Sequence, residues 1–290
     1  EEGIMTTVLL TGGSGDLGQI LAPQLLSQEY KVRNIDIAPS KKTIKDSGIE
    51  DVTASIFDRD KVVQAMQGVD VLIHIAAWHG IHEPERSPYD FHDLNVTGTM
   101  NVFEAAAKAG CKKVVFISST SVSKPYSVYG HTKILNEEQA RAYSTRHGMD
   151  IMTLRPRAFI PSWNRTVYKT FADWANWYMR GAVHIDDVAA ATMLATEYVR
   201  TNKLAPDVPL LPLDGAYEYT AEDLETWDAT GEGSTFIKHY GQQAFDLLTA
   251  NGINPAKKPK VLDISETREI LDYKPAYSLK SLIAEVKQLT

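Results

Sequence analysis

Short apolar runs alternate with segments of helical periodicity between Val8 and Arg155. The runs predicted as strands are Val8–Leu10, Val32–Asp36, Glu50–Ile56, Val71–Ile75, Lys113–Ser118 and Ile151–Arg155. The intervening segments predicted as helices are Leu17–Gln28, Asp60–Met66, Asn95–Lys108 and Tyr129–His147. Runs without polar alternation are typical of strands that are buried on both faces of a parallel sheet. The alternation predicts an α/β fold, in which helices cover a doubly wound parallel sheet.

The pattern changes after Pro156. A tryptophan-rich segment is followed by an apolar stretch at 183–188, a helix that ends near Val199, proline-spaced apolar residues and a mostly helical tail. We expect residues 1–156, joined by 183–213, to form the sheet domain. Residues 157–182 and 214–290 are expected to form a small, mainly C-terminal substrate lobe that ends in an amphipathic helix over Leu279–Leu289.

Composition narrows the class of protein. The 290 residues carry a net charge of −7 without a basic stripe, so no nucleic-acid partner is expected. No apolar run reaches transmembrane length and no signal segment is apparent, so no membrane association is expected. The single cysteine, Cys111, favours a reducing compartment, which points to the cytoplasm, and is expected to be an inert packing residue. Met5 is interpreted as the natural start of the chain.

A glycine-rich turn, Thr11-Gly12-Gly13-Ser14-Gly15-Asp16-Leu17-Gly18, lies between the first predicted strand and helix. Glycines in this pattern allow a tight turn, close approach of the backbone to a pyrophosphate, and close packing of helix on strand. The helix N-terminus would present free N–H groups to the phosphates. Asp36 ends the next strand, where a carboxylate binds the ribose hydroxyls of NAD and repels the 2′-phosphate of NADP. The pattern predicts an NAD site; a glycine-rich turn without a ligand is the alternative.

Tyr129 and Lys133 lie four residues apart in the helix that follows the fifth strand, so they share one helix face. A lysine ammonium beside a phenol lowers the pKa of the phenol towards that of a working acid or base. The preceding strand ends in Ser118-Ser119-Thr120, which places a hydroxyl near the tyrosine. The spacing therefore predicts a catalytic group, although a solvated helix face would show the same spacing.

Together these motifs resemble the extended short-chain dehydrogenase/reductase family, also called the NAD-dependent epimerase/dehydratase family. The resemblance covers residues 5–200 and also rests on His74-Ile75-Ala76-Ala77, Leu94–Thr99, Ile117-Ser118-Ser119 and Arg180–Val188. It implies a Rossmann-like fold, NAD as the cofactor and an enzyme of dehydrogenase or epimerase type.

The resemblance also implies roles for individual residues. Tyr129 is the catalytic acid/base, Lys133 binds the nicotinamide ribose, and Ser119 orients the substrate, with Thr120 in reserve. The residues implied to bind the cofactor, besides Tyr129 and Lys133, are Gly12, Gly15, Asp16, Leu17, Gly18, Asp36, Asp58, Ala76, Ala77 and Asn95. Asp58 corresponds to an adenine-contacting acid, whereas Asn95 would support the lysine through its helix or simply cap that helix.

Several histidines follow or lie within the fourth strand. His74 is expected to be packed and hydrogen-bonded, because its strand is buried. Trp78 and His79 come directly after this strand and are expected to line the substrate mouth. His79, His82 and His92 allow a metal site as an alternative, but they lack the spacing of zinc ligands, so no metal is expected.

Two departures from the family bear on the substrate. Ser119 and Tyr129 are only ten residues apart, and the segment from Lys133 to His184 is compact. The run Leu154-Arg155-Pro156-Arg157-Ala158-Phe159 lacks the Asn that nucleotide-sugar epimerases usually have there. This compactness is similar to that of uronate dehydrogenases, small members of the family that oxidise free sugar acids. By this resemblance Arg157 and Arg165 would bind a substrate carboxylate or phosphate; surface or packing arginines are the alternative.

Three functions stay open. The first is an NAD-dependent oxidoreductase acting on a small carbohydrate-like substrate, which an acidic sugar would fit. The second is a nucleotide-sugar 4-epimerase with tightly bound NAD, and the third is a non-catalytic dinucleotide-sensing protein. The intact pair of Tyr129 and Lys133 argues against the third.

The resemblance implies a homodimer formed through the helices over 95–108 and 129–147. Such an interface requires a second apolar face on each helix. The residues that suggest this second face are Val102, Phe103, Ala106, Ile134, Leu135 and Ala142.

Overall fold

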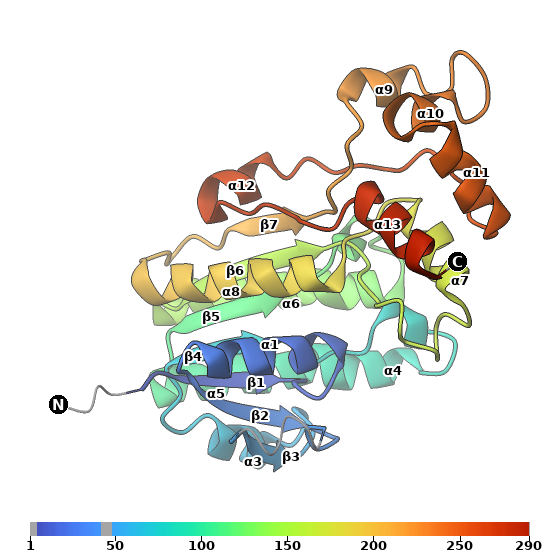
Figure 1. The fold of residues 1–290 in the computed structure, drawn as a ribbon. Coiled ribbons are helices and arrows are strands. Elements are labelled where there is room, and N and C mark those ends of the chain that lie inside the picture. Colours follow the sequence, from blue (N-terminus) through green and yellow to red (C-terminus); the bar gives the residue numbers. More distant parts are fainter. Residues whose placement is uncertain (1–4, 42–47, 290) are drawn as a thin grey trace. The chain divides into compact units, whose positions relative to one another are not determined.

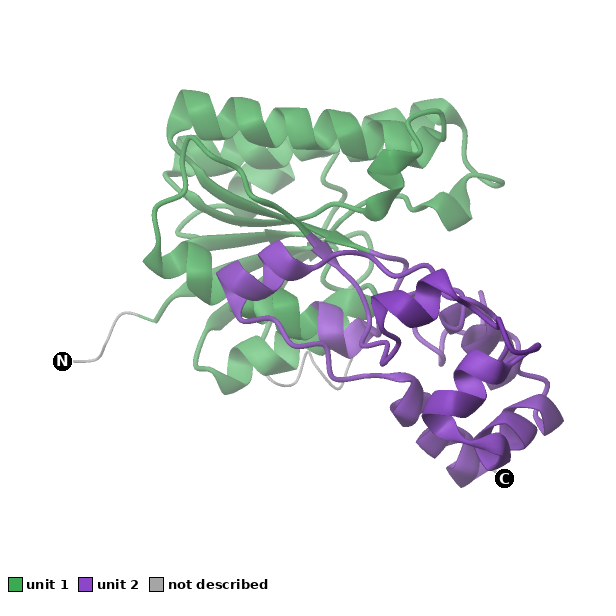
Figure 2. Ribbon diagram, turned by 90° about the horizontal axis from the view of Figure 1, so that it is seen from above, with its two compact units in different colours: residues 1–156, 189–211 green, residues 157–188, 212–290 purple. Residues whose placement is uncertain are grey.

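The computed structural model of the protein describes residues 5–41 and 48–289. The chain divides into two compact units, shown in different colours in Figure 2. The first comprises residues 1–156 and 189–211, and the second comprises residues 157–188 and 212–290. Of residues 183–213, which the sequence placed with the sheet, 189–211 belong to the first unit, whereas 183–188 and 212–213 belong to the second.

A seven-stranded sheet has the strand order β3-β2-β1-β4-β5-β6-β7. The strands are β1 (Thr7–Thr11), β2 (Lys31–Asp36), β3 (Glu50–Thr53), β4 (Val71–His74), β5 (Lys113–Ile117), β6 (Asp150–Pro156) and β7 (Leu210–Leu213). Strands β1 to β6 pair in parallel, and β1 lies between β2 and β4. The strand order therefore reverses at β1, which is where open α/β sheets bind their ligands. The predicted fold class is confirmed.

Helices cover both faces of this sheet. In Figure 1, α1 (Asp16–Ser27) and the part of α8 (Ile185–Thr201) within the first unit lie in front of the sheet. Helices α5 (Thr99–Ala109) and α6 (Val128–His147) lie behind it. Helix α3 (Arg59–Ala65) packs against α5, which in turn packs against α6.

The segment before α5 differs from the prediction. Helical conformation begins with α4 (Pro88–Phe91) and continues through a π-helical turn over His92–Gly98 into α5. Asn95 lies inside this π-helical turn, so the predicted helix start at Asn95 and its alternative role as a cap are wrong. Ser87 caps α4 instead, since its hydroxyl accepts the N–H of Asp90 at 3.2 Å. A single π-helical turn within a longer helix is frequent at functional sites.

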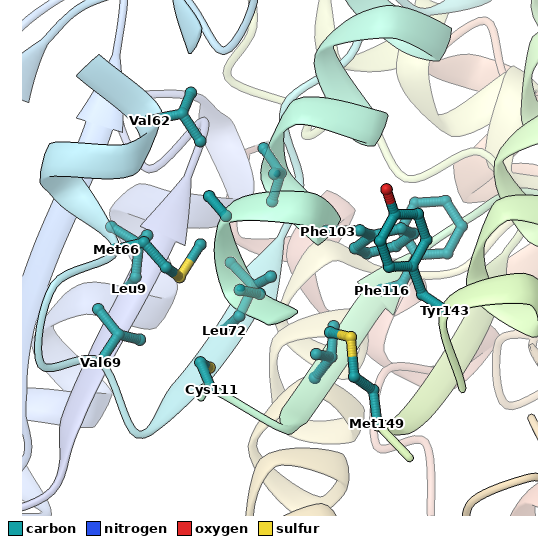
Figure 3. Packing of buried hydrophobic residues seen from close by; sticks show 14 of the residues in the cluster. Leu9, Val62, Met66, Val69, Leu72, Phe103, Cys111, Phe116, Tyr143 and Met149 are labelled. Atoms are coloured by element: carbon teal, nitrogen blue, oxygen red, sulfur yellow. The ribbon is translucent and has the colours of Figure 1, made fainter. Parts of the chain in front are cut away.

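An apolar core lies between the sheet and the helices of the first unit. Figure 3 shows side chains from the strands and helices turned towards one another; among them are Leu9, Val62, Met66, Val69, Leu72 and Met149. The ring of Phe103 meets Phe116 edge to face, with 6.0 Å between the ring centroids. Cys111 lies in the same core, where burial raises the pKa of its thiol to about 12. It is a packing residue, as predicted.

The same core bears on the predicted dimer. Val102, Phe103 and Ala106 are fully buried within it. They belong to the core-facing side of α5, so their interpretation as a second apolar face is wrong. Ile134 and Leu135 of α6 are only partly buried. A homodimer through these helices stays a prediction that rests on α6.

The second unit is mostly helical and has its own core. Its helices are α7 (Phe171–Tyr178), α9 (Ala221–Glu225), α10 (Ser234–Tyr240), α11 (Gln242–Ala250), α12 (Ser265–Leu271) and α13 (Leu279–Leu289). Trp174, Tyr178 and Phe236 pack with the apolar face of α13, whose bounds match the amphipathic pattern in the sequence. In the described part of the chain, no helix has the length and apolar character needed to span a membrane.

Candidate active site

The glycine-rich turn joins β1 to α1, and Gly12 and Gly18 leave no room there for a side chain. Gly12 has a φ of 74°, and a Cβ there would lie 2.8 Å from the Cα of Ala76. A Cβ on Gly18 would lie 2.3 Å from the Cα of Gly13. Gly15 precedes the first residue of α1 and is exposed. The backbone is therefore bare where a ligand would approach the positive end of α1.

Strand β2 fixes this turn from the side. The carboxylate of Asp36 accepts the N–H groups of Ser14 and Ala38, each at 3.0 Å. Asn34, which the sequence analysis missed, accepts the N–H of Gly13 at 2.9 Å and donates to the hydroxyl of Ser14 at 3.0 Å. Asn34 and Asp36 are two residues apart on a strand, so they project from the same face. That spacing was the available signal for Asn34.

These residues fit a dinucleotide. Helix α1 begins at Asp16 and Leu17, so the positive end of its dipole lies at this turn and is suited to a pyrophosphate. The Asp36 carboxylate, half-buried at the same turn, is suited to ribose hydroxyls. Ala76 packs against the turn at Gly12, and Ala77 follows it at the end of β4.

Removing this carboxylate tests the preference for NAD. The wild type is expected to bind NAD more tightly than NADP. Asp36→Ala is expected to weaken the binding of NAD and so to reduce the difference between the two affinities. The expected loss of NAD affinity is roughly tenfold or more, because hydrogen bonds to charged groups contribute about 1.5–3 kcal/mol. Calorimetric titration of both proteins with both dinucleotides measures it. Equal or tighter binding of NADP by the wild type would contradict the prediction.

Helix α6 directs Tyr129 and Lys133 towards the end of β5. The Ser127 hydroxyl caps the helix by accepting the N–H of Gly130 at 2.9 Å. Glu83 accepts the N–H of Tyr129 at 2.9 Å, which ties the loop after β4 to the first turn of α6. The Lys133 ammonium donates to the carbonyl of Ile117 at 2.9 Å and lies 5.9 Å from the centroid of the Tyr129 ring.

The protonation of this pair differs from the prediction. Burial raises the pKa of Tyr129 to about 12, although a hydrogen bond from the Ser119 hydroxyl lowers it. Burial lowers the pKa of Lys133 to about 7, and the charge of Glu137 raises it. The pKa of Tyr129 is thus raised and not lowered as predicted, because the loss of hydration on burial dominates it. Tyr129 is therefore a phenol at neutral pH.

Two histidines of this region are neutral. His79 places its Nδ1 3.4 Å from the Tyr129 hydroxyl, and burial lowers its pKa to about 3. His74 is hydrogen-bonded to the hydroxyls of Thr11 and Thr99 at 2.6 and 2.8 Å. Burial lowers its pKa to about 3 as well, so His74 is a packed residue, as predicted.

Asn95 acts on the loop after β4 rather than on the lysine directly. Its amide accepts the N–H of Trp78 at 2.7 Å and donates to the Trp78 carbonyl at 2.9 Å. The same amide donates to the hydroxyl of Thr132, next to Lys133 in α6, at 3.0 Å. The π-helical turn thus holds Trp78, and with it the start of the predicted substrate mouth, beside the helix of Lys133.

The remaining predicted residues of the first unit lie elsewhere. Thr120 donates weakly to the carbonyl of Pro156 at 3.5 Å, which leaves Ser119 as the hydroxyl that interacts with Tyr129. Asp58 is exposed and caps α3 by accepting the N–H of Lys61 at 3.3 Å. Among residues 5–41 and 48–289, no group of three or more His, Cys, Asp or Glu side chains could hold a metal ion.

Both predicted substrate arginines belong to the second unit. Arg157 is paired with the buried Asp214 at 3.4 Å and donates to the carbonyl of Lys260, so the packing alternative fits Arg157. Arg165 is exposed and donates one N–H to the carbonyl of Ser162 at 2.9 Å. Arg165 therefore keeps the donors with which a guanidinium binds a carboxylate.

Residues 8–205 match the sequence profile of the NAD dependent epimerase/dehydratase family. The chain belongs to this family. The protein is thus an NAD-dependent enzyme with the predicted cofactor, and the glycine-rich turn with Asp36 is in keeping with that assignment.

Two relatives and one solved structure illustrate the range of this family. A uronate dehydrogenase of Pseudomonas syringae is 26% identical over a region that covers 74% of this chain and 84% of the relative. An L-arabinose 1-dehydrogenase of Haloferax volcanii is 25% identical, with 52% of this chain and 66% of the relative covered. The structure of a UDP-glucuronic acid 4-epimerase from Bacillus cereus in complex with NAD is 20% identical and covers 98% of this chain and 99% of that protein, with a TM-score of 0.68. That likeness extends the shared fold over almost the whole chain of this family member.

Proposed function

We propose that the protein is a dehydrogenase that oxidises a hydroxyl or hemiacetal group of a small carbohydrate-like substrate, with a free sugar acid as the first candidate. The observation that carries the proposal is the hydrogen bond between Ser119 and Tyr129, beside a Lys133 ammonium on the same helix face. The compact segment from Lys133 to His184 supports a substrate of single-sugar size, because it leaves few residues to bind a nucleotide diphosphate.

The roles of the three side chains follow from their chemistry. For the oxidation, Tyr129 first releases its own proton to solvent; its phenolate oxygen then takes the proton of the substrate hydroxyl, while Ser119 hydrogen-bonds the same substrate oxygen. NAD, when bound, supplies the hydride acceptor. With a pKa of about 12, Tyr129 is already in the acid form that the reverse reduction needs. When Tyr129 ionises, the Lys133 ammonium, 5.9 Å from the centroid of its ring, is the cation beside the phenolate that the oxidation needs.

The names of the relatives support this proposal over the epimerase. Uronate dehydrogenase and L-arabinose 1-dehydrogenase both denote oxidation of single sugars or sugar acids. The nucleotide-sugar 4-epimerase is kept as the second candidate, because the solved epimerase shares the fold over nearly its full length. An epimerase would retain NAD and form no net NADH.

The exposed guanidinium of Arg165 is proposed as the anchor of an acidic substrate. Arg165→Ala is expected to raise the KM for a uronate by about tenfold or more, as expected for a lost charge-assisted bond, and to change kcat less. The KM for a neutral aldose, which has no carboxylate, is the internal control and should stay the same. Equal changes of KM for the uronate and the aldose would show that Arg165 does not bind the substrate carboxylate.

The function itself is tested by NADH formation across free sugars, sugar acids and nucleotide sugars. Net NADH from a free sugar or sugar acid is expected. The opposite result is UDP protecting the protein from thermal unfolding while free sugar acids give neither protection nor NADH. That outcome would replace the dehydrogenase by the epimerase.

A further inference from the structure

Three residues of α6 contact three consecutive residues at the end of β5. Tyr129, Lys133 and Glu137 follow one another at intervals of four, so they form one row along the helix. Lys133 donates to the carbonyl of Ile117 at 2.9 Å, and Tyr129 is hydrogen-bonded to Ser119. Between these two contacts, the hydroxyl of Ser118 donates to the Glu137 carboxylate at 2.7 Å. Glu137 thus completes the row that holds the predicted catalytic group.

Glu137 is a buried carboxylate with a complete set of partners. Its residue is 3% exposed. The guanidinium of Arg155 on β6 donates to both of its oxygens, at 2.8 and 2.6 Å. A bidentate arginine pair of this kind offsets the cost of burying a carboxylate. Three neighbouring elements, α6, β5 and β6, therefore meet at this one side chain.

The groups around Lys133 differ in charge. On α6, Tyr129 is a neutral phenol, and Glu137 is the carboxylate whose charge acts on the lysine. From β4 and the loop after it, His74 and His79 face the lysine and are both neutral, with pKa values of about 3. From β5, the lysine meets the Ile117 carbonyl and the Phe116 ring, at 5.1 Å from the ring centroid. On β6, the Arg155 guanidinium is paired with Glu137.

We propose that Glu137 is a positioning residue of the active site, which holds Ser118, and so the neighbouring Ser119, against α6 and places a negative charge one helical turn from Lys133. This inference rests on the roles proposed above for Ser119, Tyr129 and Lys133. Arg155 acts through Glu137, because its two hydrogen bonds fix the orientation of the carboxylate. The negative charge of Glu137 stabilises the ammonium of Lys133, whereas its oxygen atom accepts the hydrogen bond from Ser118.

The test separates charge from shape. Glu137→Gln keeps the size of the side chain and an acceptor for Ser118 but removes the charge. Lys133 then loses its proton at lower pH, so NAD affinity and turnover are expected to be close to wild type near pH 6 and about tenfold lower near pH 8, which corresponds to a shift of about one pKa unit. Glu138→Gln is the matched control, because Glu138 is the next residue of α6 and pairs with Arg141 on the exposed surface. Its pH profile should equal that of the wild type.

Two further measurements keep the test decisive. Glu137→Gln combined with Arg155→Met avoids a stranded guanidinium, and it should show the same pH shift if the single variant is too unstable to purify. Thermal unfolding of Glu137→Gln, without substrate or NAD, should show a larger loss of Tm relative to the wild type near pH 6 than near pH 9. At pH 6 the buried Lys133 ammonium lacks the charge of Glu137, whereas at pH 9 the lysine is neutral in both proteins.

These readouts distinguish the inference from the proposed function. NAD affinity and Tm respond to Glu137 even if no sugar is oxidised, so failure of the substrate screen leaves them intact. Equal losses at every pH in both Glu137 variants would show a purely structural role and overturn the proposal. A shifted profile in Glu138→Gln would overturn it as well.

Discussion

Tyr129→Phe is expected to lower kcat by about 10²- to 10⁴-fold, the usual contribution of a positioned acid or base. The substitution removes only the hydroxyl, and the ring keeps its buried place at the start of α6. NAD affinity should therefore change little. Turnover assays together with calorimetric titration of NAD measure the two effects separately.

A second tyrosine provides the control for this experiment. Tyr126 lies in the loop before α6 and is fully exposed, so Tyr126→Phe should leave turnover unchanged. If Tyr129→Phe retained full activity, another group would have to move the proton. His79, whose Nδ1 lies 3.4 Å from the same hydroxyl, would then be examined first.

Lys133→Met is expected to abolish most turnover, to weaken NAD binding and yet to stabilise the fold. The wild-type lysine has a pKa of about 7 in the fold, lowered by burial from the usual value of about 10.4. Between these two values the unfolded chain binds more protons than the folded one, so stability rises with pH. Below about pH 7 the fold carries the full cost of a buried ammonium.

Methionine removes that cost while filling a similar volume. The Tm of Lys133→Met is therefore expected to exceed that of the wild type by a few degrees near pH 6, since about 1 kcal/mol shifts the Tm by about 2–4 °C in chains of 150–250 residues. The difference should shrink as the pH approaches 10. A thermal scan at both ends of this range, without NAD, measures it. A lower Tm for the variant near pH 6 would show that Lys133 stabilises the fold.

Much of the fold follows from local pattern. Buried strands such as Val71–His74 carry continuous apolar runs, and α13 carries an apolar stripe, so periodicity alone predicts both. The π-helical turn over His92–Gly98 could not be predicted in this way. Asn95, inside this turn, is hydrogen-bonded to the backbone of Trp78 and to the hydroxyl of Thr132, and contacts between residues so far apart in the chain do not show in a local apolar pattern.

In the active site, too, some features follow from local sequence and others from distant contacts. Glycine spacing and the interval between Tyr129 and Lys133 are local, and they point to the correct family. The adjacent residues Glu137 and Glu138 look alike in the sequence, but one is buried against Arg155 and the other lies on the surface. The pKa of Tyr129 depends on burial by distant segments. Interactions between residues far apart in the chain decide both cases.

The contact between Asn34 and Gly13 restricts how this chain can vary. A Cβ at position 13 would lie 2.4 Å from the amide oxygen of Asn34, which already accepts the Gly13 N–H. A larger residue at position 13 therefore requires the Asn34 side chain to move or to be replaced by a smaller one, and the effects of changes at the two positions would not be additive. Because the amide of Asn34 also donates to Ser14 and Asp51, a smaller residue there would remove one hydrogen bond from each of those side chains. The dinucleotide turn and the second strand are thus coupled, so that a substitution in one alters which residues the other tolerates.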